Sequence, residues 1–164
     1  MAPRIRPAAA ADAPAALAVL HAAHAWNLAH GFNFTAATMR LDELAERLTP
    51  ETFFVAEVDG RLVGTVEVKP EPAPGMWGLH LLGVDPACAA RGVGRALVAF
   101  AEAHAAANGA DRLRLDTPEH HPWLPAFYQR LGYRQTGTVQ WEGKRYRSVY
   151  LTKSLPPSPQ GLRG

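Results

Sequence analysis

The chain has 164 residues, of which 48% are hydrophobic and 20% charged. These values are typical of one globular domain with a sizeable core and exclude a disordered chain. The formal net charge is +2 and the 17 basic residues are scattered, which disfavours nucleic-acid binding. No apolar run approaches the ~20 residues of a membrane span. With one cysteine, Cys88, and no apolar stretch of signal-peptide length at the start, we expect a cytoplasmic protein.

The first half of the chain predicts a strand, two helices and a hairpin. Residues 4–7 form the strand, and Asp12 caps a helix that contains Pro14 early and runs to about His30. Apolar spacing predicts a second helix from Thr38 to Leu48. Strands at 52–58 and 61–70 follow, and the Asp-Gly pair between them is a strong hairpin signal.

The second half alternates strands and helices. A strand at 76–84 stops at Asp85-Pro86, a helix spans Arg95 to Asn108 with Gly109 as its cap, and a strand covers 111–117. The remaining expected elements are a short helix ending at Gly132 and a final hairpin formed by 134–141 and 144–155 around Glu142-Gly143. The order β-α-α-β-β-β-α-β-α-β-β predicts an α+β domain over residues 1–155 with a mixed sheet. Residues 156–164, rich in proline and glycine, predict a disordered tail.

The stretch AARGVGRALV, residues 89–98, places two glycines at the start of a helix. Glycines let backbone N–H groups approach a ligand closely, and helix N-termini attract phosphates. Leu97 occupies the position where a dinucleotide fingerprint needs a small residue, and the Gly-Lys-Ser/Thr of a P-loop is absent. The glycines alone are equally compatible with a tight turn into a packed helix.

The wider segment GVDPACAARGVGRALVAFAEAHA resembles the acetyl-CoA-binding segment of the GNAT (GCN5-related) N-acetyltransferase family. The strand end that leads into this segment in the family is matched by Val84, Asp85 and Pro86. Its glycine pair and the following apolar position are matched by Gly92, Gly94 and Leu97. Ala89 stands where the family usually has Gln or Arg. A second register, Arg91-x-x-Gly94-x-Ala96, satisfies the family formula but changes the spacing from Pro86.

A second segment, LPAFYQRLGYRQTG, resembles the late helix of the same family. Phe127, Tyr128, Gly132 and Tyr133 match its pattern, while His121 and Leu124 stand where the family often has Asn and Ala. Together the two segments identify the chain as similar to GNAT enzymes over roughly residues 4–155.

The resemblance implies a mixed, mostly antiparallel central sheet splayed between its fourth and fifth strands, with helices on both faces. Acetyl-CoA is expected in the gap, its pantetheine paired with backbone groups of Leu82, Gly83 and Val84. Gly83 is the expected site of a bulge, and the Val84 N–H is expected to polarise the thioester carbonyl. The phosphate-binding candidates are Ala90, Arg91, Gly92, Val93, Gly94, Arg95 and Arg130.

The resemblance also implies direct transfer of an acetyl group from acetyl-CoA to an amine in a ternary complex. Tyr128 is the expected acid that protonates the departing thiolate. His80 and Glu67 are the leading candidates for the base, with Asp116 or a water chain as alternatives. Cys88 has no partner histidine pattern, which disfavours an acetyl-enzyme.

The acceptor stays open between a small-molecule amine and a peptide or protein amine. The aromatic residues Trp26, Phe32, Phe34, Trp77 and Trp123 are candidates for its pocket walls. No metal is expected, because neither His21/His24 nor His120/His121 is completed by other ligands at a recognisable spacing. We expect a monomer or homodimer with no nucleic-acid or membrane partner. The rival interpretation is a non-catalytic acyl-CoA-binding or sensor module on the same fold.

Overall fold

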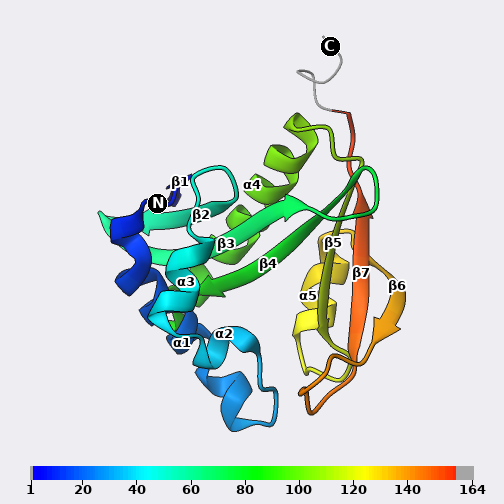
Figure 1. The fold of residues 1–164 in the computed structure, drawn as a ribbon, viewed down its shortest axis with the longest axis horizontal. Helices are drawn as coiled ribbons and strands as arrows, with labels where there is room; N and C mark the ends of the chain where they lie inside the picture. Colours follow the sequence, from blue (N-terminus) through cyan, green and yellow to red (C-terminus); the bar gives the residue numbers. More distant parts are fainter. Residues whose placement is uncertain (1, 158–164) are drawn as a thin grey trace.

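A computed structural model of the protein describes residues 2–157. The expected order of elements and the α+β class are confirmed, with one expected helix divided in two (Figure 1). The strands are β1 (Arg4–Pro7), β2 (Phe53–Val58), β3 (Arg61–Pro70), β4 (Met76–Val84), β5 (Arg112–Pro118), β6 (Arg134–Val139) and β7 (Ser148–Ser154). The α-helices are α1 (Ala13–Ala29), α2 (Thr35–Thr38), α3 (Leu41–Arg47), α4 (Val93–Ala107) and α5 (Leu124–Arg130), and the 3₁₀ segments are η1 (Ala10–Asp12) and η2 (Pro86–Arg91).

The described strands form one sheet in the order β1-β2-β3-β4-β5-β7-β6. All neighbours are antiparallel except β4 and β5, which run parallel and pair only between Met76–Gly78 and Arg112–Arg114. Beyond this contact both strands continue without pairing to each other, and Figure 1 shows them diverging. The splay expected between the fourth and fifth strands is therefore confirmed.

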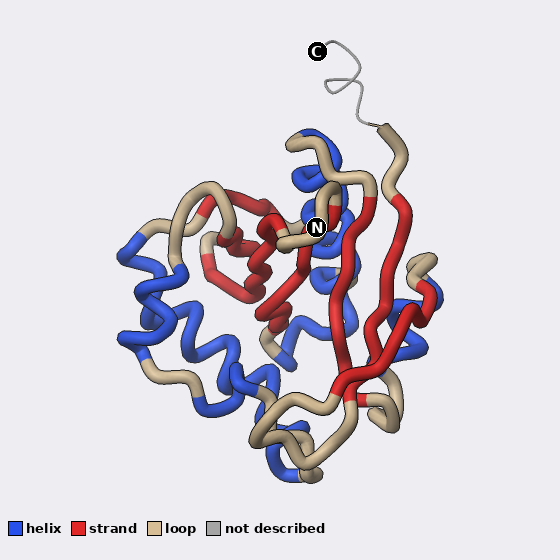
Figure 2. Tube along the Cα trace, turned by 45° about the vertical axis from the view of Figure 1, so that its right-hand side comes forward, coloured by secondary structure: helices blue, strands red, loops and turns tan. Residues whose placement is uncertain are grey.

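Helices cover both faces of the sheet, as the side-chain alternation of β2 demonstrates. Phe53 and Val55 are buried in one cluster with residues of α1 and α3, whereas Phe54 and Ala56 are buried in another with residues of α4. Successive side chains of a strand point to opposite faces, so these clusters are two separate cores. Figure 2 shows the helices on both sides of the strands.

The prediction of one helix from Thr38 to Leu48 is wrong at its beginning, where the structure has two helices, α2 and α3. Met39 and Arg40 have extended backbones, with ψ of 140° and 158°, and they separate α2 from α3. Met39 is buried in the core on the α1 face, and the Arg40 N–H donates to the Glu43 carboxylate (3.0 Å). Burial of Met39 and this capping contact together account for the break.

The second strand of the final hairpin is shorter than expected, since β7 begins at Ser148 and not at Lys144. Lys144 instead donates to the Asn33 carbonyl (2.7 Å) and the Thr35 hydroxyl (3.0 Å), which carries the β6–β7 loop to the start of α2. This contact places the loop over the open end of the splay.

The expected tail, 156–164, lies mostly outside the described residues, and the domain boundary at 155 stays a prediction. Among residues 2–157, every helix is too short or too polar to cross a membrane.

Candidate active site

Two cavities open where β4 and β5 separate, and they share the wall formed by His24, Leu82 and Leu124. The glycine-turn cavity has a volume of about 650 Å³ and is lined by Ala89, Ala90, Gly92, Gly94 and Arg95 together with Val84 and Phe127. The loop cavity has a volume of about 560 Å³ and is lined by His80, Asp116, Tyr128, Lys144, Tyr146 and Ser148, among others. A ligand filling one cavity can therefore meet a ligand filling the other.

The two glycines of the turn have different roles. Gly92 has φ of 76°, a left-handed conformation that ends η2 and starts α4, and side chains adopt it at a cost. A Cβ on Gly94 would lie 3.6 Å from Val84 and 3.8 Å from Phe127, which is ordinary contact. Gly92 thus serves the turn, whereas Gly94 keeps the cavity open. The first N–H groups of α4 have no partner within the helix and are available to an anion.

The structure brings most of the expected phosphate-binding residues together. Ala90, Gly92, Gly94 and Arg95 line the glycine-turn cavity. Val93 is fully buried in the α4 core, so only its backbone is available to a ligand. Arg91 and Arg130 are exposed and do not line the cavity.

The bulge in β4 lies one step before its expected position. Thr65 pairs with Gly83 and Glu67 with His80, so Leu81 and Leu82 together face Val66. Leu81 has φ of 50°, and its carbonyl accepts a hydrogen bond from the Thr65 hydroxyl (2.8 Å). Gly83 instead lies close to α1, where an added Cβ would make a tight contact of 3.0 Å with the Leu20 side chain. The bulge at Gly83 is therefore wrong, although Leu82 and Val84 do line the cavity.

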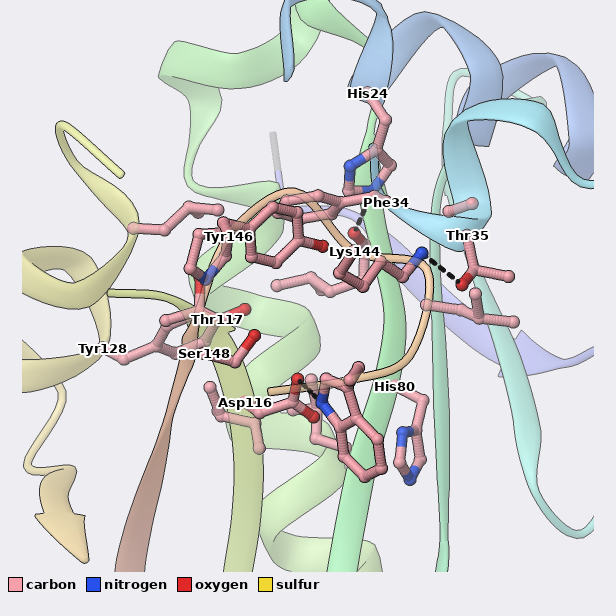
Figure 3. Close-up of a pocket in the computed structure, with 18 of the residues that line it drawn as sticks. His24, Phe34, Thr35, His80, Asp116, Thr117, Tyr128, Lys144, Tyr146 and Ser148 are labelled. Atoms are coloured by element: carbon pink, nitrogen blue, oxygen red, sulfur yellow. Dashed lines mark hydrogen bonds between the residues drawn. The ribbon is translucent and has the colours of Figure 1, made fainter. Parts of the chain in front are cut away.

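Tyr128 is the buried residue of α5 and lines the loop cavity. Burial raises the pKa of its phenol well above the usual value, and the Asp116 carboxylate adds to the shift, so the hydroxyl is protonated at neutral pH. In Figure 3, Tyr128, Thr117 and Ser148 occupy one side of the cavity and His80 the other. Tyr128 thus brings a protonated phenol to the wall of the loop cavity.

The two leading base candidates have different surroundings. His80 lines the loop cavity, and burial lowers the pKa of its imidazole despite the carboxylates of Glu67 and Glu71, so the ring is neutral at pH 7. The Glu71 carboxylate lies 3.5 Å from His80 Nε2. Glu67 is 2% exposed and does not line the cavity. Burial would raise the pKa of Glu67, but its ion pair with Arg47, together with Lys69 and His80, lowers the pKa below its usual value. The geometry favours His80 over Glu67.

Lys144 and Asp116 bring opposite charges into the loop cavity. The Lys144 ammonium uses two of its donors on Asn33 and Thr35, which leaves one for a ligand. Burial lowers the pKa of Lys144, and the carboxylate of Asp116 acts in the opposite direction. Asp116 accepts a hydrogen bond from the indole of Trp141 (3.0 Å). The sequence alone did not point to Lys144, because its place depends on contacts with residues more than 100 positions away.

The expected aromatic wall is distributed over several sites. Phe34 lines the loop cavity, while Trp26 and Trp123 line the glycine-turn cavity. Phe32 packs against His121 with ring centroids 4.9 Å apart, and Trp77 packs against His104 in a T-shaped pair.

Within the described part of the chain, no group of three or more His, Cys, Asp or Glu side chains is arranged to hold a metal ion.

The chain belongs to the acetyltransferase (GNAT) family, whose model matches residues 20–133. It is 32% identical to the S-(2-succino)cysteine N-acetyltransferase of Bacillus subtilis (strain 168), over 94% of this chain and 98% of that protein. Its fold is shared by the PaiA N-acetyltransferase from Thermoplasma acidophilum in complex with coenzyme A (TM-score 0.77, 18% identity, 94% and 99% coverage). The same holds for the ribosomal-protein-S18-alanine N-acetyltransferase from Escherichia coli (TM-score 0.76, 17% identity, 97% coverage of both chains). The chain is thus an acyltransferase of the N-acetyltransferase class, and it shares its fold with a protein whose structure was solved in complex with coenzyme A.

Proposed function

We propose that this protein transfers an acetyl group from acetyl-CoA to the amine of a small amino-acid acceptor, directly and without a metal. The observation that carries the proposal is the shared wall of the two cavities at Leu82, His24 and Leu124. A thioester reaching this wall from the glycine-turn cavity meets an amine in the loop cavity. Tyr128 lines the loop cavity and lies on the same helix as Leu124 of the shared wall.

The cofactor lies with its pyrophosphate on the N–H groups of residues 92–95, and the exposed side chains of Arg91, Arg95 and Arg130 add positive charge around it. Its pantetheine runs along β4 past the bulge. The Asp85 N–H donates to Val63 on β3 (2.8 Å), and antiparallel pairing alternates between the two edges of a strand. The Val84 N–H therefore faces the gap, where it is positioned to polarise the thioester carbonyl.

In the reaction, the acceptor ammonium first loses a proton, which His80 takes directly or through water. The free amine attacks the thioester carbonyl, a C–N bond forms, and the C–S bond of the tetrahedral intermediate breaks. Tyr128 donates its proton to the departing thiolate, and the proton lost by the nitrogen restores the phenol. The products are the N-acetyl acceptor, CoA thiol and one released proton.

The charges of the loop cavity favour an acceptor with its own carboxylate. Lys144 offers a free donor to a carboxylate, and Asp116 offers an acceptor to the ammonium of the same molecule. An α-amino acid carries these two groups. The 32% identical relative is named for acetylating S-(2-succino)cysteine, an amino acid derivative, which supports this class.

Thiol release from acetyl-CoA across amino acids and their decarboxylated amines tests the acceptor class. We expect turnover with amino acids, and Lys144→Met to lower kcat/KM for them by about 10–100-fold, the size of a charged hydrogen bond. The decarboxylated amines lack the carboxylate, so a loss of kcat/KM with them reports loosening of the β6–β7 loop. Lys144→Arg tests whether a positive charge alone is enough to bind the carboxylate. Equal losses for both kinds of amine contradict the role of Lys144. CoA binding without turnover on any amine favours the non-catalytic module.

The oligomeric state and the cytoplasmic location stay predictions.

A further inference from the structure

A chain of hydrogen bonds starts at the segment before α5. The backbone N–H groups of Trp123 and Leu124 donate to His121 Nδ1, at 3.3 and 3.2 Å. With Nδ1 accepting, the neutral ring carries its proton on Nε2. That Nε2–H donates to Asn27 Oδ1 on α1, at 2.7 Å.

The chain continues from α1 to β4. The Asn27 amide nitrogen donates to His24 Nδ1, at 3.0 Å. His24 therefore also carries its proton on Nε2, and this proton is donated to the Leu82 carbonyl at the bulge (3.2 Å). Every link fixes the direction of the next, so the chain is intact only when both imidazoles are neutral.

The three side chains in this hydrogen-bond network are buried, at 8% exposure for His24, 6% for Asn27 and 5% for His121. Aromatic rings enclose them, with Phe34 against His24 and with Trp26, Phe32 and Trp123 against His121. Burial and the neighbouring His24 lower the pKa of His121 to about 4, and burial lowers the pKa of His24. Away from water, such hydrogen bonds gain strength and break at a high cost.

This chain of hydrogen bonds spans the gap between β4 and β5. Leu82 lies on β4, at one side, and α5 follows β5 at the other, in the region where these strands no longer pair. Leu82 lines both cavities, and α5 carries Tyr128. The chain therefore connects the cofactor-facing edge of β4 to the helix that bears the proposed acid.

We infer that His24, Asn27 and His121 are positioning residues that set the width of the gap, and with it the distance from Tyr128 to the thioester on β4. The inference rests on the proposed function, because it assigns the chain an effect on acetyl transfer. His121 stands at a position where members of the GNAT family often have Asn. An imidazole there can accept from the start of α5 and donate to α1 at the same time, through its two opposite nitrogens.

Asn27→Asp separates this role from simple packing. An aspartate accepts from His121 but cannot donate to His24, so the whole chain forms only when His24 is protonated. The new carboxylate beside His24 Nδ1 favours the protonated ring and opposes the effect of burial, so we expect kcat of the variant, divided by that of the wild type, to be highest at low pH. It should fall about tenfold as pH rises to 9, because small misplacements of reacting groups cost rate. Groups that titrate in the same way in both proteins cancel in this ratio of the two kcat values. Around His24 these groups are His80, Asp116, Glu142, Lys144, Tyr146, Arg95, Tyr128 and the Arg47–Glu67 pair.

Two further measurements keep the inference testable if this variant folds poorly. Ring ¹⁵N chemical shifts of the wild type should report His24 and His121 as neutral with Nε2 protonated. Asn27 also lines the glycine-turn cavity, so Asn27→Leu is measured at saturating acetyl-CoA, where it should lower kcat at least tenfold. In the Tyr128→Phe background, the same change should cost little further.

The inference is overturned by a pH-independent ratio in a folded Asn27→Asp protein, by other histidine tautomers, or by additive losses in the double variant. A wild-type protein without turnover on any amine refutes the proposed function instead. The ring shifts then still decide whether the chain exists, so the two failures are distinguishable.

Discussion

Tyr128→Phe is expected to lower kcat by about 10²–10⁴-fold, which is the usual loss when a general acid is removed and equals about 3–5 kcal/mol of barrier. The phenylalanine ring keeps the packing against Phe127 and Tyr133, whose ring centroids lie 5.0 and 5.8 Å away. The loss is therefore chemical and not structural. Steady-state thiol release with the best amine measures it.

The control for Tyr128→Phe is Tyr133→Phe. Tyr133 is also buried and in contact with Tyr128, but its hydroxyl donates to Glu102 (2.9 Å), away from either cavity. We expect this control to lose stability and to keep its turnover. If the folded Tyr128→Phe protein turns over like the wild type, Tyr128 is a packing residue and the thiolate leaves unassisted.

Gly94→Glu is expected to weaken acetyl-CoA binding by about 100-fold or more. A carboxylate introduced here lies in the glycine-turn cavity, where the pyrophosphate is proposed, and like charges a few ångströms apart repel by several kcal/mol near a protein surface. The fold should survive, because a Cβ at this position meets only ordinary contacts with Val84 and Phe127. Calorimetric titration with acetyl-CoA measures the effect.

Gly94→Gln has the same bulk as glutamate without its charge, so the difference between the two variants isolates the electrostatic part. We expect the glutamine variant to bind more tightly than the glutamate variant, and Gly94→Ala to bind most tightly of the three. Equal affinities of Gly94→Glu and the wild type place the cofactor's phosphates elsewhere.

Local signals in the sequence predicted most of the fold. The Asp59-Gly60 turn, with φ of 52° and 75°, joins β2 to β3 as its dipeptide indicates. The strand, glycine turn and helix around Gly92 also follow from neighbouring residues. Each of these features depends on contacts within a few positions of the chain.

The errors arise where contacts distant in the sequence decide. Met39 is buried on the α1 face, and this burial breaks a helix that apolar spacing alone would extend. Gly83, where a bulge was expected, lies instead against Leu20 of α1. The ion pair of Glu67 with Arg47 is a contact of the same distant kind, and the role of Glu67 as a base stays a prediction.

The site residues that sequence reasoning missed depend on the same kind of contact. His121 and Asn27 are 94 positions apart and meet only because the segment between β5 and α5 reaches α1 in the fold. The spacing of His24 and Asn27 on one helix face was the one local signal of their contact.

A crystal structure of the protein with CoA and its best acceptor tests the central claim most directly. We expect the pyrophosphate on the N–H groups of residues 92–95, and the sulfur at the wall shared by the two cavities, within hydrogen-bonding distance of the Tyr128 hydroxyl. The acceptor amine should approach from the loop cavity. A sulfur atom that lies away from Leu82 and Tyr128, or an acceptor bound outside the loop cavity, would contradict direct transfer between the two cavities.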